Sequence, residues 1–188
     1  MMRNKTLGIV GYGDIAIECA RMAKHGFKTR IFALKRDTST ITEEGKELAD
    51  EIVGPEGLPR ILAESDYILN VLPLTPETEG LFGEKEFAMM KKSAIFANIG
   101  RGKTVVEKDL VSALKDKTIR GAVLDVFEME PLPVDSELWD MENVVNTQHS
   151  ADWTTDYVDR VVNVFGSELQ RFIKGEKMEN IVSKETGY

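Results

Sequence analysis

The sequence predicts an α/β protein built on a doubly wound parallel sheet. Short runs of apolar and β-branched residues alternate with longer amphipathic stretches along the 188 residues. This alternation is typical of parallel strands joined by crossover helices. The expected strands are residues 7–10, 30–34, 67–71, 94–98, 121–124 and 144–146. The expected helices are residues 14–25, 41–52, 58–64, 85–90, 108–114 and 154–174. Six strands with such crossovers are enough for one sheet of this class.

Composition restricts the classes of function. The formal net charge is −8, which argues against nucleic acid or an anionic membrane as the main partner. The apolar runs are much shorter than the roughly 20 residues that a membrane-spanning helix needs. The single cysteine, Cys19, cannot form an internal disulfide, and this fits a reducing compartment. We therefore expect a cytoplasmic protein without a nucleic-acid or membrane partner.

The first strand ends in a glycine-rich turn. Gly11 and Gly13 belong to a G-x-G-x-x-A pattern that closes with Ala16. Alone the pattern is weak, but here it follows a strand and opens a helix, which is the context of a dinucleotide site. Gly11 permits the tight turn, Gly13 lets the backbone approach a pyrophosphate, and the helix N-terminus with Asp14 and Ile15 faces the phosphates. The alternative is an ordinary turn with incidental glycines. The strand order favours a Rossmann-type dinucleotide-binding domain.

The end of the second strand bears on the choice of cofactor. An NAD site usually has an acidic residue there for the ribose hydroxyls, whereas this chain has Lys35 and Arg36. Two cations suit the 2′-phosphate of NADP. Nearby Asp37, Glu43 and Glu44 argue against it, and a solvated basic loop is the structural alternative. We favour NADP over NAD.

Two helix ends and one helix face can be predicted. The first helix should be closed by Gly26, because glycine readily adopts the left-handed conformation that ends helices. The helix expected over residues 41–52 should end near the Gly54-Pro55 pair. The last helix carries apolar residues at helical spacing: Tyr157, Val161, Phe165, Leu169 and Phe172.

Four further motifs follow predicted strands. They lie just past carboxyl ends, where open α/β sheets bind ligands. The motifs are residues 72–78 (LPLTPET), 98–102 (NIGRG), 125–131 (DVFEMEP) and 147–149 (TQH). In this order they resemble the D-isomer-specific 2-hydroxyacid dehydrogenases, a family that includes phosphoglycerate, glycerate, hydroxypyruvate/glyoxylate and D-lactate dehydrogenases. The resemblance runs from residue 5 to residue 188.

The resemblance implies a catalytic set of three residues. Arg101 would bind and polarise the carboxylate and keto group of the substrate. His149 would be the general acid in reduction and the general base in oxidation. Glu130 would pair with His149, orient it and favour its charged form. The reaction implied is hydride transfer between NAD(P)H and a small 2-keto acid.

The resemblance also implies a set of cofactor-binding residues. Asp125 would lie near the nicotinamide, and Leu72, Pro73 and Thr78 would line the cofactor groove. Ile99, Gly100 and His149 complete the set together with the residues of the glycine-rich turn and the Lys35–Arg36 pair. We assign no metal ligands.

The catalytic set makes chemical sense without the family name. Arginine binds a carboxylate through two parallel hydrogen bonds. Imidazole can protonate the alkoxide that hydride addition creates, and a carboxylate partner favours the charged imidazole. Each residue has a structural alternative: Arg101 could pair with surface carboxylates, Glu130 could cap the next segment, and His149 could be a structural histidine. Their joint occurrence at successive strand ends favours the functional interpretation.

The resemblance also suggests how the chain is organised. We expect a dinucleotide-binding domain over residues 1–151, and a C-terminal helix and tail over residues 152–188. The family has a substrate domain before the phosphate turn, so here this domain is expected to be missing or separately encoded. A homodimer is expected by the same resemblance. The alternative function is a non-catalytic NAD(P)-binding or dimerisation module.

Overall fold

The computed structural model describes residues 2–184. It divides into two compact units, the first ending at His149 and the second beginning at Ser150. The two units are therefore described separately.

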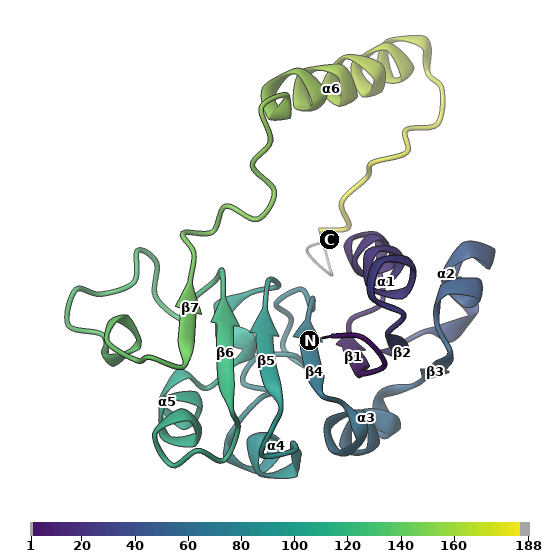
Figure 1. Cartoon of the computed structure of the whole chain (residues 1–188). Helices are drawn as coiled ribbons and strands as arrows, with labels where there is room; N and C mark the ends of the chain where they lie inside the picture. Colours follow the sequence, from purple (N-terminus) through teal and green to yellow (C-terminus); the bar gives the residue numbers. More distant parts are fainter. Residues whose placement is uncertain (1, 185–188) are drawn as a thin grey trace. The chain divides into compact units, whose positions relative to one another are not determined.

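The first unit contains one sheet of seven parallel strands. Their order is β3-β2-β1-β4-β5-β6-β7, so the chain reverses its direction of winding between β1 and β4 (Figure 1). The strands are β1 (Thr6–Val10), β2 (Arg30–Leu34), β3 (Glu51–Val53), β4 (Tyr67–Asn70), β5 (Ile95–Asn98), β6 (Gly121–Leu124) and β7 (Val144–Asn146). The predicted doubly wound parallel sheet is confirmed, and the reversal point is where such sheets bind ligands.

Helices cover the sheet and enclose two hydrophobic cores. The helices are α1 (Asp14–Phe27), α2 (Glu43–Leu48), α3 (Leu58–Glu64), α4 (Glu84–Met89) and α5 (Glu107–Lys115). One core joins α1 and α2 to the strands, with Ile9, Ala20 and Ile31 at its centre. The other joins α3, α4 and α5 to the strands around Phe87 and Phe96. A layer of helices on each side is what a sheet with apolar residues on both faces requires.

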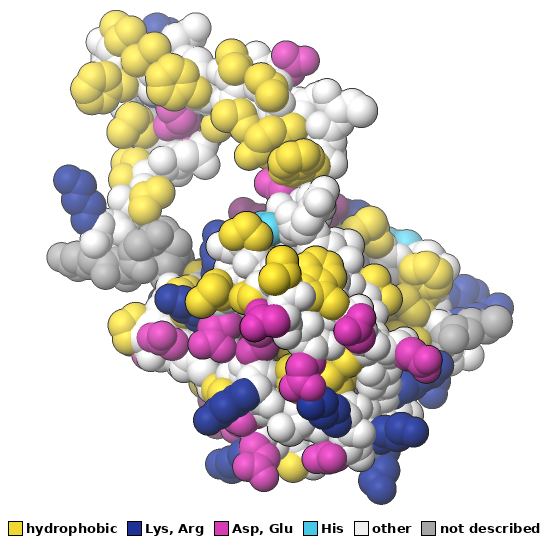
Figure 2. Space-filling model, turned by 90° about the vertical axis from the view of Figure 1, so that its left-hand side faces the viewer, with side chains coloured by type: hydrophobic (Ala, Val, Ile, Leu, Met, Phe, Trp, Pro, Cys, Tyr) yellow, Lys and Arg dark blue, Asp and Glu magenta, His cyan; other side chains and the backbone are white. Residues whose placement is uncertain are grey.

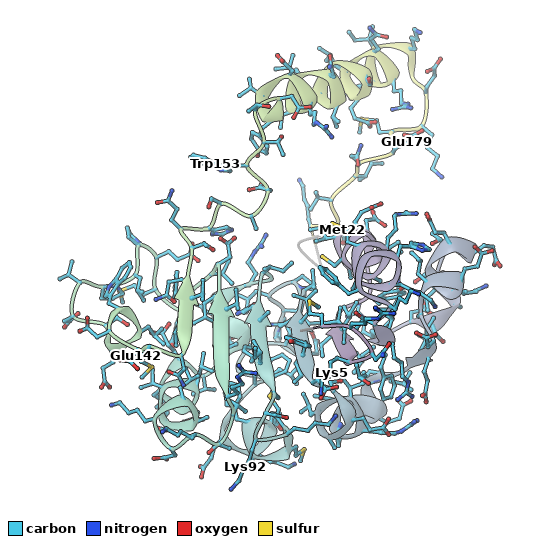
Figure 3. The ribbon with its side chains drawn as sticks, viewed as in Figure 1. Lys5, Met22, Lys92, Glu142, Trp153 and Glu179 are labelled. Atoms are coloured by element: carbon cyan, nitrogen blue, oxygen red, sulfur yellow. The ribbon has the colours of Figure 1, made fainter. Side chains whose placement is uncertain are left out.

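The parallel register brings the carboxyl ends of the strands to the same end of the sheet. Val10 pairs with Asn70, Asn70 pairs with Asn98, and Asn98 pairs with Leu124. Lys92 and Glu142, labelled in Figure 3, lie in the turns before β5 and β7 and so mark the opposite end of the sheet, where the strands begin. The loops that follow Val10, Asn70, Asn98 and Leu124 therefore share one end of the sheet.

The helix predicted over residues 41–52 is wrong over residues 49–52. Helix α2 ends at Leu48, and β3 follows and pairs with β2. The Asp50 N–H donates to the Ile31 carbonyl at 2.9 Å, and the Asp50 carboxylate accepts from the Ile31 N–H at 2.8 Å. Because these bonds hold the chain beside β2, pairing at the sheet edge overrides the local helical pattern. The sheet accordingly has seven strands rather than six.

The predicted closure of the first helix at Gly26 is also wrong. Helix α1 continues through Gly26 to Phe27, and Lys28 takes the left-handed conformation at φ 54°. The Lys28 N–H donates to the Lys24 carbonyl at 3.0 Å, and the Thr29 N–H donates to the Ala23 carbonyl at 3.3 Å. These bonds satisfy the last carbonyls of the helix, which is the task of a C-terminal cap.

The second unit consists mainly of one amphipathic helix, α6 (Tyr157–Lys174). It ends at Gly175 in the left-handed conformation. Figure 2 shows hydrophobic side chains gathered along it, and they are exposed in this structure: Val161, Phe165, Leu169, Phe172 and Ile173. Within residues 2–184, no helix has the length and hydropathy of a membrane span.

Candidate functional site

The turn after β1 has the geometry of a phosphate-binding turn. Gly11 has φ +97°, and a Cβ there would lie 3.0 Å from the Val71 carbonyl, so glycine is required. A Cβ on Gly13 would meet no atom within 4 Å, which leaves the backbone open to a ligand. Gly13 also precedes α1, whose N-terminus has no side-chain cap. Asp14 and Ile15 lie exposed on the first helical turn.

The two predicted cations follow β2 directly. The Lys35 N–H donates to the Val53 carbonyl at 3.0 Å, which fixes the start of the loop. Arg36 is exposed, and Lys35 is half-buried. The Asp37 carboxylate accepts from the Ser39 hydroxyl at 2.6 Å and from the Ser39 N–H at 3.0 Å. These two bonds, together with the nearby cations, lower the pKa of Asp37.

The other two acids that argued against a 2′-phosphate are also engaged. Glu43 pairs with Lys46 at 2.7 Å. Glu44 pairs with Arg21, and hydrogen bonding to Arg21 lowers the pKa of Glu44. The carboxylates near the basic pair thus have partners of their own, which weakens the sequence argument against NADP.

The loop after β4 is stabilised by its own threonine. The Thr78 hydroxyl donates to the Pro73 carbonyl at 2.7 Å and accepts from the Thr75 N–H at 2.8 Å. The Leu72 N–H donates to the Asn70 side chain at 3.2 Å. Leu72 and Pro73 are half-buried. Thr78, which is predicted to line the cofactor groove, therefore also has a structural role within this loop.

Arg101 lies in the loop after β5. Its side chain is exposed, and Nη1 donates to the Gly100 carbonyl at 2.7 Å. Among the ion pairs of residues 2–184, none includes Arg101, so the surface-pair alternative receives no support. Ile99 precedes Gly100 and donates its N–H to the Asn70 carbonyl at 3.1 Å.

Glu130 and His149 meet as predicted. His149 Nδ1 lies 2.7 Å from Glu130 Oε2, and Glu130 Oε1 accepts from the Phe127 N–H at 3.0 Å. Burial alone would raise the pKa of Glu130, but the bonds from His149 and Phe127 and the charge of Arg101 lower it. His149 has φ +54°, an uncommon conformation for a non-glycine residue. Such strain is typical of functional sites.

A glycine holds two of these loops together. A Cβ on Gly102 would lie 1.7 Å from the Phe127 carbonyl oxygen, so the backbones after β5 and β6 touch at this point. Buried Asp125 begins the loop after β6, and its carboxylate accepts from the Thr147 hydroxyl at 2.5 Å. The segments bearing Arg101, Glu130 and His149 are therefore interlocked.

Three polar residues that were not predicted from the sequence organise this end of the sheet. Asn70, Thr104 and Thr147 received no role, although Asn70 stands at a strand end, where a buried amide is unusual. Among residues 2–184, no group of three or more His, Cys, Asp or Glu side chains could hold a metal ion.

Comparison with known proteins agrees with the motifs. The family model "D-isomer specific 2-hydroxyacid dehydrogenase, NAD binding domain" matches residues 1–151. Glyoxylate/hydroxypyruvate reductase B of Enterobacter sp. (strain 638) is 43% identical over 179 residues, which cover 90% of this chain and 53% of the relative. Glyoxylate reductase of Korarchaeum cryptofilum is 42% identical over 181 residues, which cover 96% and 53%. The chain thus spans about half the length of the curated relatives that it matches.

Solved structures give the same result. An NADPH-dependent glyoxylate/hydroxypyruvate reductase from Sinorhizobium meliloti, in complex with NADP and sulfate, has a TM-score of 0.87 at 32% identity and covers 98% of this chain and 57% of its own. A D-isomer specific 2-hydroxyacid dehydrogenase from Xanthobacter autotrophicus Py2, in complex with NADPH and MES, has a TM-score of 0.87 at 34% identity and covers 98% and 73%. The chain therefore belongs to the D-isomer-specific 2-hydroxyacid dehydrogenase family and contains that family's NAD-binding domain.

Proposed function

We propose that this chain supplies the cofactor-binding and proton-transfer groups of an NADP(H)-dependent reductase of small 2-keto acids. The 2.7 Å contact between His149 and Glu130, with Arg101 close enough to lower the pKa of Glu130, is the observation that carries the proposal. The named relatives are glyoxylate and hydroxypyruvate reductases, so glyoxylate and hydroxypyruvate are the first substrates to test.

The residues present fit a dinucleotide. Gly13 leaves open space at an uncapped helix N-terminus, which suits a pyrophosphate. Lys35 and Arg36 suit a 2′-phosphate, and the similar structures hold NADP or NADPH. In the proposal, Asp125 lies near the nicotinamide, and Leu72, Pro73, Thr78, Ile99 and Gly100 border the bound cofactor.

The proposed chemistry assigns one task to each catalytic residue. A reduced nicotinamide nucleotide, held by the turn at Gly13 and by Lys35 and Arg36, would supply the hydride that the carbonyl carbon needs. The Arg101 guanidinium binds the substrate carboxylate. Because Glu130 occupies Nδ1 of His149, Nε2 is left to give a proton to the carbonyl oxygen. Hydride and proton together convert the 2-keto acid to the 2-hydroxy acid.

Titration with NADPH and NADH, followed by nucleotide fluorescence, tests the cofactor. We expect tighter binding of NADPH, and we expect Lys35→Asp to shift the preference toward NADH because an acid repels the 2′-phosphate. Lys92→Asp is the matched control, since Lys92 lies at the opposite end of the sheet. Equal affinity for both nucleotides, unchanged in Lys35→Asp, would show that the NADP assignment is wrong.

A turnover assay distinguishes the two proposed functions, an enzyme and a non-catalytic binding module. Glyoxylate and NADPH are supplied together with a second polypeptide, which is the part of a glyoxylate reductase relative that this chain does not cover. The loss of NADPH absorbance is then followed. Reduction that His149→Ala abolishes supports the enzyme. Tight NADPH binding without any reduction would support the alternative, a non-catalytic NAD(P)-binding or dimerisation module.

The proposal extends to organisation and partners. We propose a boundary between residues 151 and 152, self-association to a homodimer, and a cytoplasmic location. The exposed apolar residues of α6 favour self-association, and the lone Cys19 fits a reducing compartment. Sedimentation tests the self-association, and cell fractionation tests the cytoplasmic location.

A further inference from the structure

Three polar side chains lie completely buried beneath the candidate site. Asn70, at the end of β4, is 0% exposed, Asn98, at the end of β5, is 1% exposed, and Thr104, after Arg101, is 0% exposed. Asn70 and Asn98 are direct partners in the sheet register. Buried amides need hydrogen-bond partners, so their bonds show what they hold.

The three side chains bond to one another. Asn70 Nδ2 donates to Asn98 Oδ1 at 3.0 Å and to Thr104 Oγ1 at 2.7 Å. Both hydrogens of this amide are thereby used. The cluster is continuous across two strand ends and the loop that follows them.

The remaining bonds of the cluster go to main-chain atoms of the site. The Leu72 N–H donates to Asn70 Oδ1 at 3.2 Å, and the Gly100 N–H donates to Asn98 Oδ1 at 3.1 Å. The Arg101 carbonyl accepts from Thr104 Oγ1 at 2.6 Å and from Asn98 Nδ2 at 3.3 Å. The network therefore ends on the loop after β4 and on both sides of Arg101.

We propose that Asn70, Asn98 and Thr104 form a positioning network, which fixes the backbone of Arg101 relative to the cofactor loop at Leu72. This inference rests on the proposed function, because it assumes that Arg101 binds the substrate carboxylate and that Leu72 borders the cofactor. Because the three side chains are buried, the network acts through the main-chain atoms that it bonds.

Physical reasons separate this role from simple packing. Asparagine is disfavoured in strands, and an apolar pair of similar shape fills a core at no cost in unpaired groups. The exposed Arg101 side chain has no ion-pair partner among the described residues that would orient it. A bidentate carboxylate contact tolerates little displacement, so the position of the Arg101 main chain decides where its guanidinium can reach.

Substitution of Thr104 gives a matched test. Thr104→Val keeps the shape and removes the hydroxyl, whereas Thr104→Ser keeps the hydroxyl. Thr29→Val is the control, because Thr29 is also buried, but its hydroxyl has no hydrogen-bond partner among the described residues. If valine prevents folding, Thr104→Cys, with a weak S–H donor, takes its place.

Amide hydrogen exchange is the first measurement, and it needs no ligand. We expect exchange at Leu72 and Gly100 to be about tenfold faster in Thr104→Val, because valine removes the two buried hydrogen bonds of the Thr104 hydroxyl. Thr104→Ser should restore the slow rates, and Ile9 in β1 should be unaffected. Unchanged rates at Leu72 and Gly100 would overturn the inference. So would an acceleration that includes Ile9 and that Thr29→Val reproduces.

Ligand binding is the second measurement. Oxamate, an unreactive amide with the shape of a small 2-keto acid, is titrated into the NADPH complex. In Thr104→Val we expect oxamate affinity to fall about tenfold, and NADPH affinity to change much less. Equal loss of both affinities, or no recovery of oxamate affinity in Thr104→Ser, contradicts the positioning role. If the unmodified chain binds no NADPH, the proposed function fails, and hydrogen exchange still decides the network.

Discussion

Glu130 makes a separate contact with each of its two carboxylate oxygens. It holds His149 Nδ1 at 2.7 Å with one oxygen and accepts from the Phe127 N–H with the other. Glu130→Gln keeps the shape and removes the charge. We expect the rate of glyoxylate reduction to fall by roughly 10²-fold, a typical contribution for general acid–base groups. Steady-state kinetics measures this effect. Glu128→Gln, at an exposed neighbour, should have little effect, and an equal loss there would contradict the assignment.

The pKa of Glu130 provides a second prediction. Burial favours the neutral carboxyl, but the bonds from His149 and Phe127 outweigh it and lower the pKa below its ordinary 4.5. The stabilisation from these bonds is therefore present above about pH 4.5 and is lost as the pH falls through the lower folded value. Carbon-detected NMR of the Glu130 carboxyl should show a midpoint below 4.5, and His149→Ala should raise it. A midpoint unchanged by this substitution would show that His149 does not lower the pKa of Glu130.

At this scale the sequence predicts charged groups better than buried ones. Arg101, Glu130 and His149 were predicted because they lie in motifs that resemble those of a known family, and these motifs follow strand ends, where the topology of an α/β sheet gathers ligand-binding groups. Asn70 and Thr104 were missed because their partners come from different strands, and sequence spacing does not reveal which amides face each other. The roles of all these residues stay predictions.

At the scale of elements, Asp66 connects β1 to the turn before β4. Its carboxylate accepts from the Thr6 N–H at 3.0 Å and lies 3.4 Å from Lys5, labelled in Figure 3, and from Lys91. Burial opposes ionisation, but the Thr6 bond and the two lysines lower the pKa of Asp66 below 3.8. Asp66→Asn should reduce the free energy of unfolding by about 1–2 kcal/mol at neutral pH.

The sign of the pH effect follows from the lowered pKa. The contribution of Asp66 is complete above about pH 3.8 and disappears as the pH falls through the folded value. Urea unfolding of Asp66→Asn and of the unmodified chain should therefore converge at low pH. Asp135→Asn, at an exposed residue, serves as control. A stability difference that stays constant from pH 7 to the acid range would show that the charge is not responsible.

Helix α6 supports a prediction about association. Phe165 and Phe172 are 65% and 68% exposed, and an apolar stripe of this kind favours contact with another surface. The double substitution Phe165→Glu and Phe172→Glu should lower the sedimentation-derived association constant. Asn163→Glu and Gln170→Glu add the same charge to the helix and should have less effect. Equal loss in both double variants would mean that charge, not the stripe, controls association.

Elements that depend on the whole sheet were the least predictable. The periodic pattern located α1, α5 and every strand except β3, because their apolar residues pack into the two cores. It misassigned β3, which exists through pairing with β2, and the end of α1, where Lys28 replaces the expected Gly26. In both places a long-range or cap interaction outweighs the local preference.

For the whole molecule, the location of the predicted catalytic residues leads to a final prediction. Arg101, Glu130 and His149 all come from the first unit, and the 188 residues span 53% of the length of the two relatives described above. Binding of a nucleotide needs the turn and strand ends that this unit holds. Rapid hydride transfer also needs a surface that closes over the substrate and excludes water.

We therefore expect the 188-residue polypeptide to bind NADPH but to reduce glyoxylate slowly by itself. A polypeptide of residues 1–151 should bind NADPH with the same affinity, because the proposed cofactor residues end at His149. Fluorescence titration measures binding, and nicotinamide absorbance measures turnover in parallel. Fast glyoxylate reduction by the polypeptide alone would show that this unit can shield the reacting atoms itself. Loss of NADPH binding in residues 1–151 would instead show that the helical unit is needed for the nucleotide site to form.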